Sequence, residues 1–315
     1  MRTKNALKAV SRGAAFAVFT LILLATLSIT AHARVDQNER AIIDFRNTPN
    51  TGTVSIRLAR SVAPMQARVR IEKGGMTYNY HLRNDGTAEL FPLQMGNGDY
   101  SIRILIGPAP DGSGRFAVAL AATYNLNLSE RNRNAVFLNP NQFVNFNRDS
   151  QLVTKAAEII RDARARTTLE KVEALYRFIV DEFDYDIEKA KRVIRGEMTG
   201  YVPNPDEILA ARTGICFDYT SLLAAMLRSQ GIPAKLITGH VSNPDPRAPA
   251  GSVIYHAWNE FYLPERGGWF RINEMRFDGR RFERLDPTFE ATSRGSNAAM
   301  RFIGDGTNYT TIREF

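Results

Sequence analysis

The chain has 315 residues, enough for about two domains of ordinary size. Hydrophobic residues make up 44% of it and charged residues 23%, which is typical of a globular protein and argues against extensive disorder. The formal net charge is +8, and without the four basic residues at the N-terminus it is +4. No cluster of lysine or arginine is interleaved with aromatic residues, so the sequence argues against nucleic acid as a partner.

The first 33 residues have the pattern of a secretory signal peptide. Basic residues precede an uncharged, mostly apolar run over 14–29, and Ala31-His32-Ala33 matches a signal-peptidase site. We therefore expect residues 1–33 to be removed and the protein to be secreted, periplasmic or on the cell surface. A retained membrane anchor is the alternative, although the apolar run is short for a span. No other segment is long and apolar enough, so no stable membrane span is expected after cleavage.

Residues 36–146 have the two-residue period of half-buried strands and predict a small all-β sandwich domain. Apolar residues alternate with polar or small ones around 54–58, 76–82, 100–106 and 124–128. Glycine-rich turns between these runs suit antiparallel hairpins. Several short strands need a second layer to bury one face, which favours a sandwich. His81 falls within one of these strands and is interpreted as a surface or partly packed histidine.

From residue 147 the pattern becomes α+β and predicts a second domain over 147–315, with helices packed on an antiparallel sheet. Helices are expected around 152–160 and 172–183, the second with Thr167 and Glu170 spaced as a capping box. A short third helix is expected to begin at Asn204, and 186–199 is either a helix or an ordered loop. Strands are expected at 236–241, 254–263, 269–272, 282–285 and 309–315. The proline-rich loop 243–251 is a candidate rim or lid.

The only cysteine, Cys216, stands where a helix is expected to begin. Gly214 precedes it, a buried helical face follows it, and Gly231 supplies the stop. At a helix N-terminus the backbone amides and the helix dipole favour the thiolate, which is the nucleophilic form. The alternative is a cysteine that only fills a core. A single cysteine excludes an intramolecular disulfide and a multi-thiolate metal site.

A cysteine nucleophile needs a base, and His256 is the main candidate. His256 and Trp258 alternate onto one face of a predicted strand, where the indole would limit water and shape a substrate-binding pocket. Asp286 ends the next strand before a proline, where its carboxylate can orient a histidine on the neighbouring strand. Each also has a plainer interpretation, as a packed histidine and as an aspartate that caps the Pro287 turn. His240 ranks below His256 because no tryptophan-bearing strand supports it.

Three segments, Thr-Gly-Ile-Cys-Phe-Asp-Tyr at 213–219, Tyr-His-Ala-Trp at 255–258 and Leu-Asp-Pro-Thr at 285–288, resemble the core motifs of the transglutaminase-like superfamily. The resemblance covers roughly residues 147–289. It implies a papain-like arrangement with Cys216 as nucleophile, His256 as general base and acid, and Asp286 as orienting carboxylate. It implies no calcium and no cofactor, and it implies acyl transfer from an amide through a thioester, ending on water or on an amine.

Two hypotheses follow. The first is an exported acyl-transfer enzyme that acts on peptide or protein substrates in the cell envelope, with the β-rich half as a substrate- or wall-binding module. The second is a non-catalytic binding or scaffold protein of the cell envelope. The N-glycanase branch is disfavoured because the sequence lacks paired Cys-x-x-Cys zinc motifs. The Cys216 backbone amide is the expected first oxyanion donor, and the second is open between Tyr201 and Asn204. The substrate and the oligomeric state also remain open.

Overall fold

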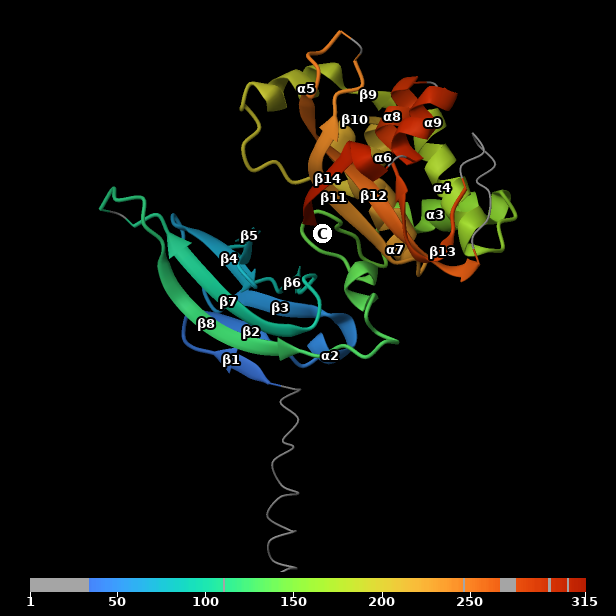
Figure 1. Ribbon diagram of the computed structural model, residues 1–315. Coiled ribbons are helices and arrows are strands. Elements are labelled where there is room, and N and C mark those ends of the chain that lie inside the picture. The colour runs from blue at the N-terminus through green and yellow to red at the C-terminus, as the bar shows by residue number, and fades with distance from the viewer. Residues whose placement is uncertain (1–33, 110, 246, 267–275, 294–295, 305) are drawn as a thin grey trace, which may run out of the picture.

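The computed structural model describes residues 34–109, 111–245, 247–266, 276–293, 296–304 and 306–315. A strand-rich part, blue to green in Figure 1, lies beside a part that combines helices with another sheet, yellow-green to red. The predicted α+β class is confirmed. The proposed signal peptide and the strand predicted at 269–272 lie outside the described residues. The domain boundaries at 36–146 and 147–315 stay a prediction.

The strand-rich part is a sandwich of two antiparallel four-stranded sheets. Its first sheet has the order β1-β2-β3-β6 and its second the order β5-β4-β7-β8. The strands are β1 (Val35–Gln37), β2 (Ala41–Asp44), β3 (Thr53–Leu58), β4 (Gln66–Lys73), β5 (Met76–Leu82), β6 (Glu89–Pro92), β7 (Gly98–Gly107) and β8 (Ala117–Leu126). Alternate residues of β2 to β8 contribute to one buried cluster, so the predicted sandwich is confirmed. Met76, expected with the inward residues of its strand, is 42% exposed because it lies next to the turn that opens β5.

Two short helices precede the second part. Helix α2 (Thr48–Thr51) lies between strands of the sandwich, and the 3-10 helix η1 (Ala135–Leu138) lies in the connection to the second part. Its elements are α3 (Gln151–Asp162), α4 (Thr168–Glu182), β9 (Asp184–Tyr185), α5 (Ile187–Ile194), α6 (Pro205–Ala211), β10 (Thr213–Gly214), α7 (Cys216–Ser229), β11 (Ala234–Ser242), β12 (Val253–Arg266), β13 (Gly279–Leu285), α8 (Pro287–Ser293), α9 (Asn297–Gly304), the 3-10 helix η2 (Gly306–Asn308) and β14 (Tyr309–Glu314). The segment 186–199, for which the sequence allowed either a helix or an ordered loop, contains helix α5. Helices α8 and α9 were not predicted. Among the described residues, no helix is long and apolar enough to cross a membrane.

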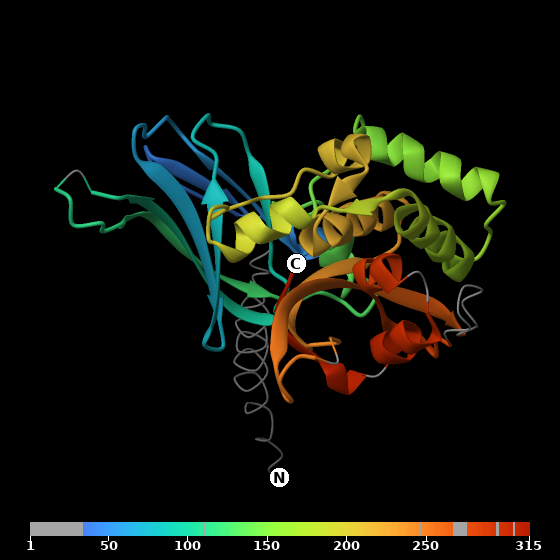
Figure 2. The same cartoon turned by 90° about the horizontal axis from the view of Figure 1, so that it is seen from above.

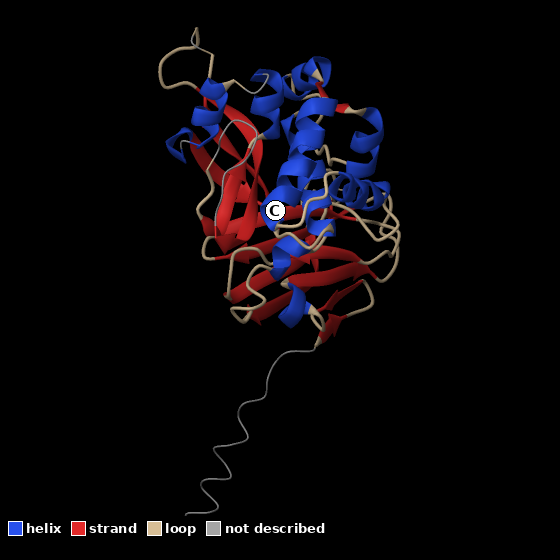
Figure 3. Cartoon of the chain, turned by 90° about the vertical axis from the view of Figure 1, so that its right-hand side faces the viewer, coloured by secondary structure: helices blue, strands red, loops and turns tan. Residues whose placement is uncertain are grey.

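Helix α7 is the centre of this second part. It packs against β11 and β12 of the sheet β13-β12-β11-β14, and α3, α4 and α6 pack around its other sides. Residues 218–227 of the helix have no exposed surface. A helix buried on all sides cannot shift without disturbing the whole core, so its first residue has a fixed position. In Figure 3 most of the helices lie in the upper half of the molecule and the sandwich strands in the lower half.

The last strand, β14, lies between the two parts. It pairs with β11, and the end of the chain is central in both Figures 1 and 2. The Gln94 side chain of the sandwich donates to the Glu314 carbonyl at 3.1 Å, and the Glu314 amide donates to the Tyr78 hydroxyl at 3.2 Å. The Phe315 ring lies edge-on to Tyr80 and to Phe143. Strand β14 therefore joins the sandwich to the sheet that carries His256.

Candidate active site

Cys216 is the first residue of α7, as the sequence predicted, and it is half-buried. The two-residue strand β10 leads into it and pairs in parallel with β9, with Gly214 opposite Tyr185. A Cβ on Gly214 would lie 2.6 Å from the Asp218 Cβ, so only glycine fits before the helix turn. The first amides of a helix have no partner within the helix. The thiol is thus placed at the positive end of the α7 dipole.

Asp218 fixes the start of α7 from within. Its buried carboxylate accepts hydrogen bonds from the Ile215 amide at 2.9 Å, from Lys189 Nζ at 2.6 Å and from the Tyr201 hydroxyl at 2.5 Å. Lys189 also donates to the Tyr201 hydroxyl at 2.7 Å. These contacts tie helix α5 and the segment before α6 to the residue two positions after the cysteine. We call Lys189, Tyr201 and Asp218 the α7 anchor.

His256 and Asp286 form a buried pair. His256 Nε2 and Asp286 Oδ2 lie 2.8 Å apart, and the two residues are 4% and 0% exposed. The two residues come from neighbouring strands, but they do not lie directly opposite each other. Leu285 pairs with Asn259, and Asp286 lies just beyond this register, where β13 has ended. Asp286 also caps α8 by accepting from the Phe289 amide at 3.0 Å, which confirms the capping interpretation, and its role as orienting carboxylate in catalysis stays a prediction.

The charge of Asp286 determines the protonation of His256. Burial by itself lowers the pKa of the imidazole, but the Asp286 carboxylate and its hydrogen bond act in the opposite direction. Together with the nearby Cys216 side chain they raise the pKa of His256 to about 10. At neutral pH the ring is therefore an imidazolium. Because Nε2 is bound to Asp286, Nδ1 is the nitrogen that can exchange a proton with the thiol.

One aromatic ring covers the imidazole, and Trp258 lies two residues further along the same strand. The Phe289 ring stacks on His256 with centroids 4.4 Å apart and planes 13° apart. Trp258 has no exposed surface, and its ring packs against Tyr309 at 5.0 Å. A substrate would reach the indole only if the covering residues moved, so the substrate-binding role of Trp258 stays a prediction. In the structure the buried Trp258 ring packs against Tyr309.

Two further residues support the site and were not found from the sequence. The Tyr309 hydroxyl donates to Asp286 Oδ2 at 2.9 Å, from a strand 23 residues further along the chain. The fully buried Asn259 amide donates to the Thr220 carbonyl in α7 and to the Lys235 carbonyl in β11. Asn259 therefore fixes the cysteine helix to the sheet that carries His256. The only sequence signal for Asn259 was its position as a polar residue in the alternation of Tyr255, Ala257 and Phe261.

The remaining candidates have other contacts than the His256–Asp286 pair. The Tyr201 hydroxyl is bound to Asp218, and the Asn204 amide donates to Glu207 at 2.8 Å. Their roles as oxyanion donors stay predictions. His240 is exposed on β11 and faces Tyr255. Among the described residues, no group of three His, Cys, Asp or Glu side chains is arranged to hold a metal ion.

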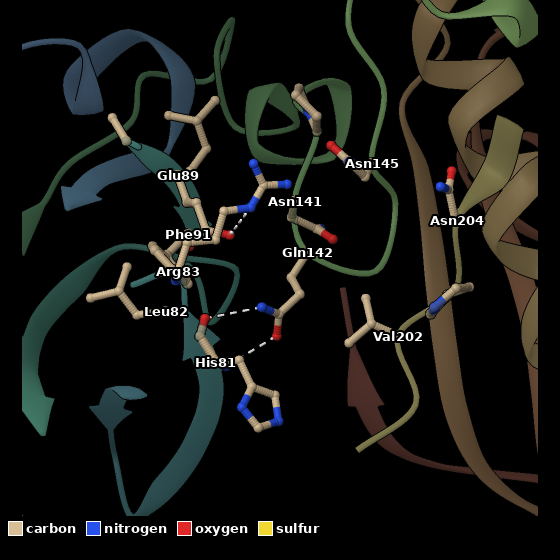
Figure 4. A pocket seen from close by; sticks show the side chains of 14 residues that line it. His81, Leu82, Arg83, Glu89, Phe91, Asn141, Gln142, Asn145, Val202 and Asn204 are labelled. Carbon is tan, nitrogen blue, oxygen red and sulfur yellow. Dashed lines mark hydrogen bonds and ion pairs between the residues drawn. The ribbon is translucent and has the colours of Figure 1, made fainter. Parts of the chain in front are cut away.

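A separate cavity of about 480 Å³ lies between the sandwich and the second part. It is lined by β5 and β6 on one side and by segments 140–145 and 202–204 on the other. Figure 4 shows the Gln142 carboxamide bound to the backbone of His81, where it donates to the carbonyl at 3.0 Å and accepts from the amide at 3.2 Å. His81 thus lines this cavity. The cavity contains none of Cys216, His256 and Asp286.

Comparisons with known proteins agree with the motif assignment. Residues 154–274 match the family model described as the transglutaminase-like superfamily. A protein-glutamine gamma-glutamyltransferase of Pseudomonas aeruginosa is 28% identical over 123 residues, which are 37% of this chain and 17% of that protein. An uncharacterized protein of Mycobacterium tuberculosis is 28% identical over 97 residues, 30% of each chain. The solved periplasmic domain of TgpA from Pseudomonas aeruginosa has 16% identity and a TM-score of 0.35, covering 73% of this chain and 92% of that domain.

The alignments cover at most 30% of the length of these curated relatives. The family match includes Cys216 and His256, and Asp286 follows it by 12 residues. All three motifs occur in the order that the resemblance predicted. Residues 154–274 of this chain are thus similar to the transglutaminase-like superfamily.

Proposed function

We propose that this protein is a cysteine-dependent enzyme that transfers an acyl group from an amide of a peptide or protein through a thioester. The observation that supports this most is the buried His256–Asp286 pair next to a half-buried thiol at the start of a helix. A charged imidazole beside a thiol stabilises the thiolate and supplies a proton for the leaving group. Cysteine, histidine and aspartate are the residue types that this chemistry needs, and they follow one another along the chain in the order of the resemblance.

The first half-reaction acylates the cysteine. The Cys216 thiolate attacks the amide carbonyl carbon, a carbon–sulfur bond forms, and the carbonyl electrons move to the oxygen. The backbone amide of Cys216 at the start of α7 faces the developing negative charge. His256 then gives its proton to the amide nitrogen, the carbon–nitrogen bond breaks, and ammonia or an amine leaves. The product is a thioester and a neutral imidazole.

The second half-reaction regenerates the thiolate. Water or a primary amine attacks the thioester while His256 accepts the proton of the nucleophile. The carbon–sulfur bond breaks, and the thiolate and the imidazolium are restored. Asp286 holds the imidazole by Nε2 in both halves, which leaves Nδ1 as the nitrogen available to the nearby Cys216 side chain. A glutamine side chain as acyl donor fits the proposal, because one relative is named as a protein-glutamine gamma-glutamyltransferase.

The test is incubation of the mature protein with a glutamine-containing peptide and a labelled primary amine. Amine incorporation supports cross-linking, and release of ammonia without incorporation supports hydrolysis. Both should disappear in Cys216→Ala and His256→Gln, and both should survive in His240→Gln, a matched change of an exposed histidine. If Cys216→Ala keeps full function in its native host, the non-catalytic scaffold hypothesis replaces this one.

Export is part of the proposal and rests on the N-terminal sequence. Cleavage after Ala33 would leave Arg34 as the first residue, directly before strand β1. Mass spectrometry of the protein recovered from outside the cytoplasm should therefore give a chain that begins at residue 34. Recovery of the intact chain from the membrane would support the retained anchor instead.

A further inference from the structure

The carboxylate of Asp286 is held by donors from three elements. Its Oδ2 atom lies 2.8 Å from His256 Nε2 in β12 and accepts from the Tyr309 hydroxyl in β14 at 2.9 Å. Its Oδ1 atom accepts from the Phe289 amide in α8 at 3.0 Å. The main-chain carbonyl of Asp286 accepts from the Tyr176 hydroxyl at 3.1 Å. His256 and Tyr309 therefore share one oxygen atom.

Tyr309 is held in place independently of Asp286. Its ring packs against Trp258 at 5.0 Å and against Phe302 at 6.0 Å, and the Arg284 guanidinium lies 4.5 Å from the ring centroid. The residue is 9% exposed and lies on strand β14, which pairs with β11. A side chain fixed on several sides presents its hydroxyl at one position.

The hydroxyl of Tyr309 acts as a donor. Burial and the neighbouring Asp286 carboxylate both raise the pKa of Tyr309 far above its usual range, so the proton stays on the phenol oxygen. A second donor on Oδ2 withdraws charge from the oxygen that binds the imidazolium. The carboxylate then stabilises the imidazolium less strongly than it would with His256 as its only side-chain donor.

We propose that Tyr309 is a positioning residue of the site: its hydroxyl directs Asp286 Oδ2 toward His256 and limits how strongly the carboxylate stabilises the imidazolium. The role rests on the proposed function, because His256 must release its Nδ1 proton to the leaving nitrogen during acylation, and a less stabilised imidazolium releases that proton more readily. Tyr309 lies beyond the family match at residues 154–274, in the strand that joins the sandwich to the second part. The last strand of the chain would thus complete the site.

Other charged and titratable groups face the pair and stay the same when the Tyr309 hydroxyl is removed. Cys216 approaches His256 from α7, and the Tyr176 hydroxyl in α4 reaches the Asp286 carbonyl. Glu290 in α8 acts on Tyr176, and Arg284 in β13 lies over the Tyr309 ring. A change in the His256 titration after removal of one hydroxyl therefore reports on the Tyr309–Asp286 hydrogen bond.

The experiment compares the His256 titration in Cys216→Ser and in Cys216→Ser/Tyr309→Phe by NMR of histidine-labelled full-length mature chain. The serine background removes the thiolate, and a His256→Gln spectrum assigns the signal. Loss of the hydroxyl should raise the pKa of His256, by on the order of one unit. Tyr100→Phe is the matched control, since it removes a buried tyrosine hydroxyl that donates to Leu93 and Gly96 in the sandwich. It should leave the titration unchanged.

An unchanged His256 titration in Tyr309→Phe, or an equal shift in Tyr100→Phe, would overturn the proposal. If Tyr309→Phe fails to fold, 3-fluorotyrosine at position 309 gives the test with the opposite sign. A more acidic phenol is a stronger donor, so the pKa of His256 should fall, and a rise or no change would refute the role. Because these readouts need no turnover, absence of acyl transfer in the wild type would count against the proposed function alone.

Discussion

The α7 anchor offers a prediction whose size follows from the structure. Asp218→Asn keeps the shape of the side chain but removes the charge that faces Lys189 Nζ at 2.6 Å. Asp218 has no exposed surface, and the Lys189 side chain is 18% exposed. Loss of one partner of a buried ion pair costs about 3–5 kcal/mol, and the partial exposure of Lys189 favours the low end. We therefore expect the free energy of unfolding to fall by about 3 kcal/mol.

Urea unfolding followed by tryptophan fluorescence measures this change in the right part of the molecule, because both tryptophans follow residue 250 and the sandwich contains none. With a slope of roughly 2 kcal/mol per molar urea, the midpoint should fall by about 1.5 M. Asp181→Asn is the control, since its pair with Arg177 is 3.5 Å long and about half exposed, and it should cost less than about 1 kcal/mol. If Asp218→Asn costs no more than Asp181→Asn, the anchor does not hold α7 as described.

Three further predictions follow. Asp286→Asn should lower kcat in the ammonia-release assay by roughly a hundred- to ten-thousand-fold, because an amide cannot stabilise the imidazolium; a decrease below tenfold would contradict this role. In Cys216→Ser the free energy of unfolding should fall as pH rises above 6.5, because above this pH only the folded chain still holds the His256 proton. Relative to the same chain with His256→Gln, the slope should reach up to about 1.4 kcal/mol per pH unit. Parallel curves of unfolding free energy against pH for the two chains would refute this prediction. Gly239→Ala should lower the unfolding free energy by at least about 2 kcal/mol, because its Cβ would lie 2.1 Å from the Thr310 carbonyl oxygen of β14, and an unchanged urea midpoint would contradict that contact.

Local patterns predicted most of the elements that place the site. The period of apolar residues gave the extent of α7, and its first residue was correctly expected at Cys216. The capping box between Thr167 and Glu170 is present at the start of α4. These features depend on residues within one or two helical turns, where propensity and periodicity carry the information.

The contacts that complete the site depend on residues far apart in the chain. Lys189 reaches Asp218 across 29 positions, and Tyr309 reaches Asp286 across 23. Neither contact has a local sequence pattern, because the residues that flank a buried tyrosine or a paired lysine do not distinguish it from other tyrosines or lysines. The burial of Trp258 was missed for a related reason: alternation tells which side chains share a face, but not what covers that face.

The central proposal is that Cys216 reacts as a thiolate because the imidazolium of His256, which the Asp286 carboxylate stabilises, lies beside it. The most direct measurement is the rate of iodoacetamide alkylation of Cys216 across pH in the mature protein and in His256→Gln. The account predicts fast alkylation at and below neutral pH in the wild type, and loss of this reactivity in the variant. Alkylation of both proteins along the curve of an ordinary free thiol, with a pKa of about 8.5, would contradict it.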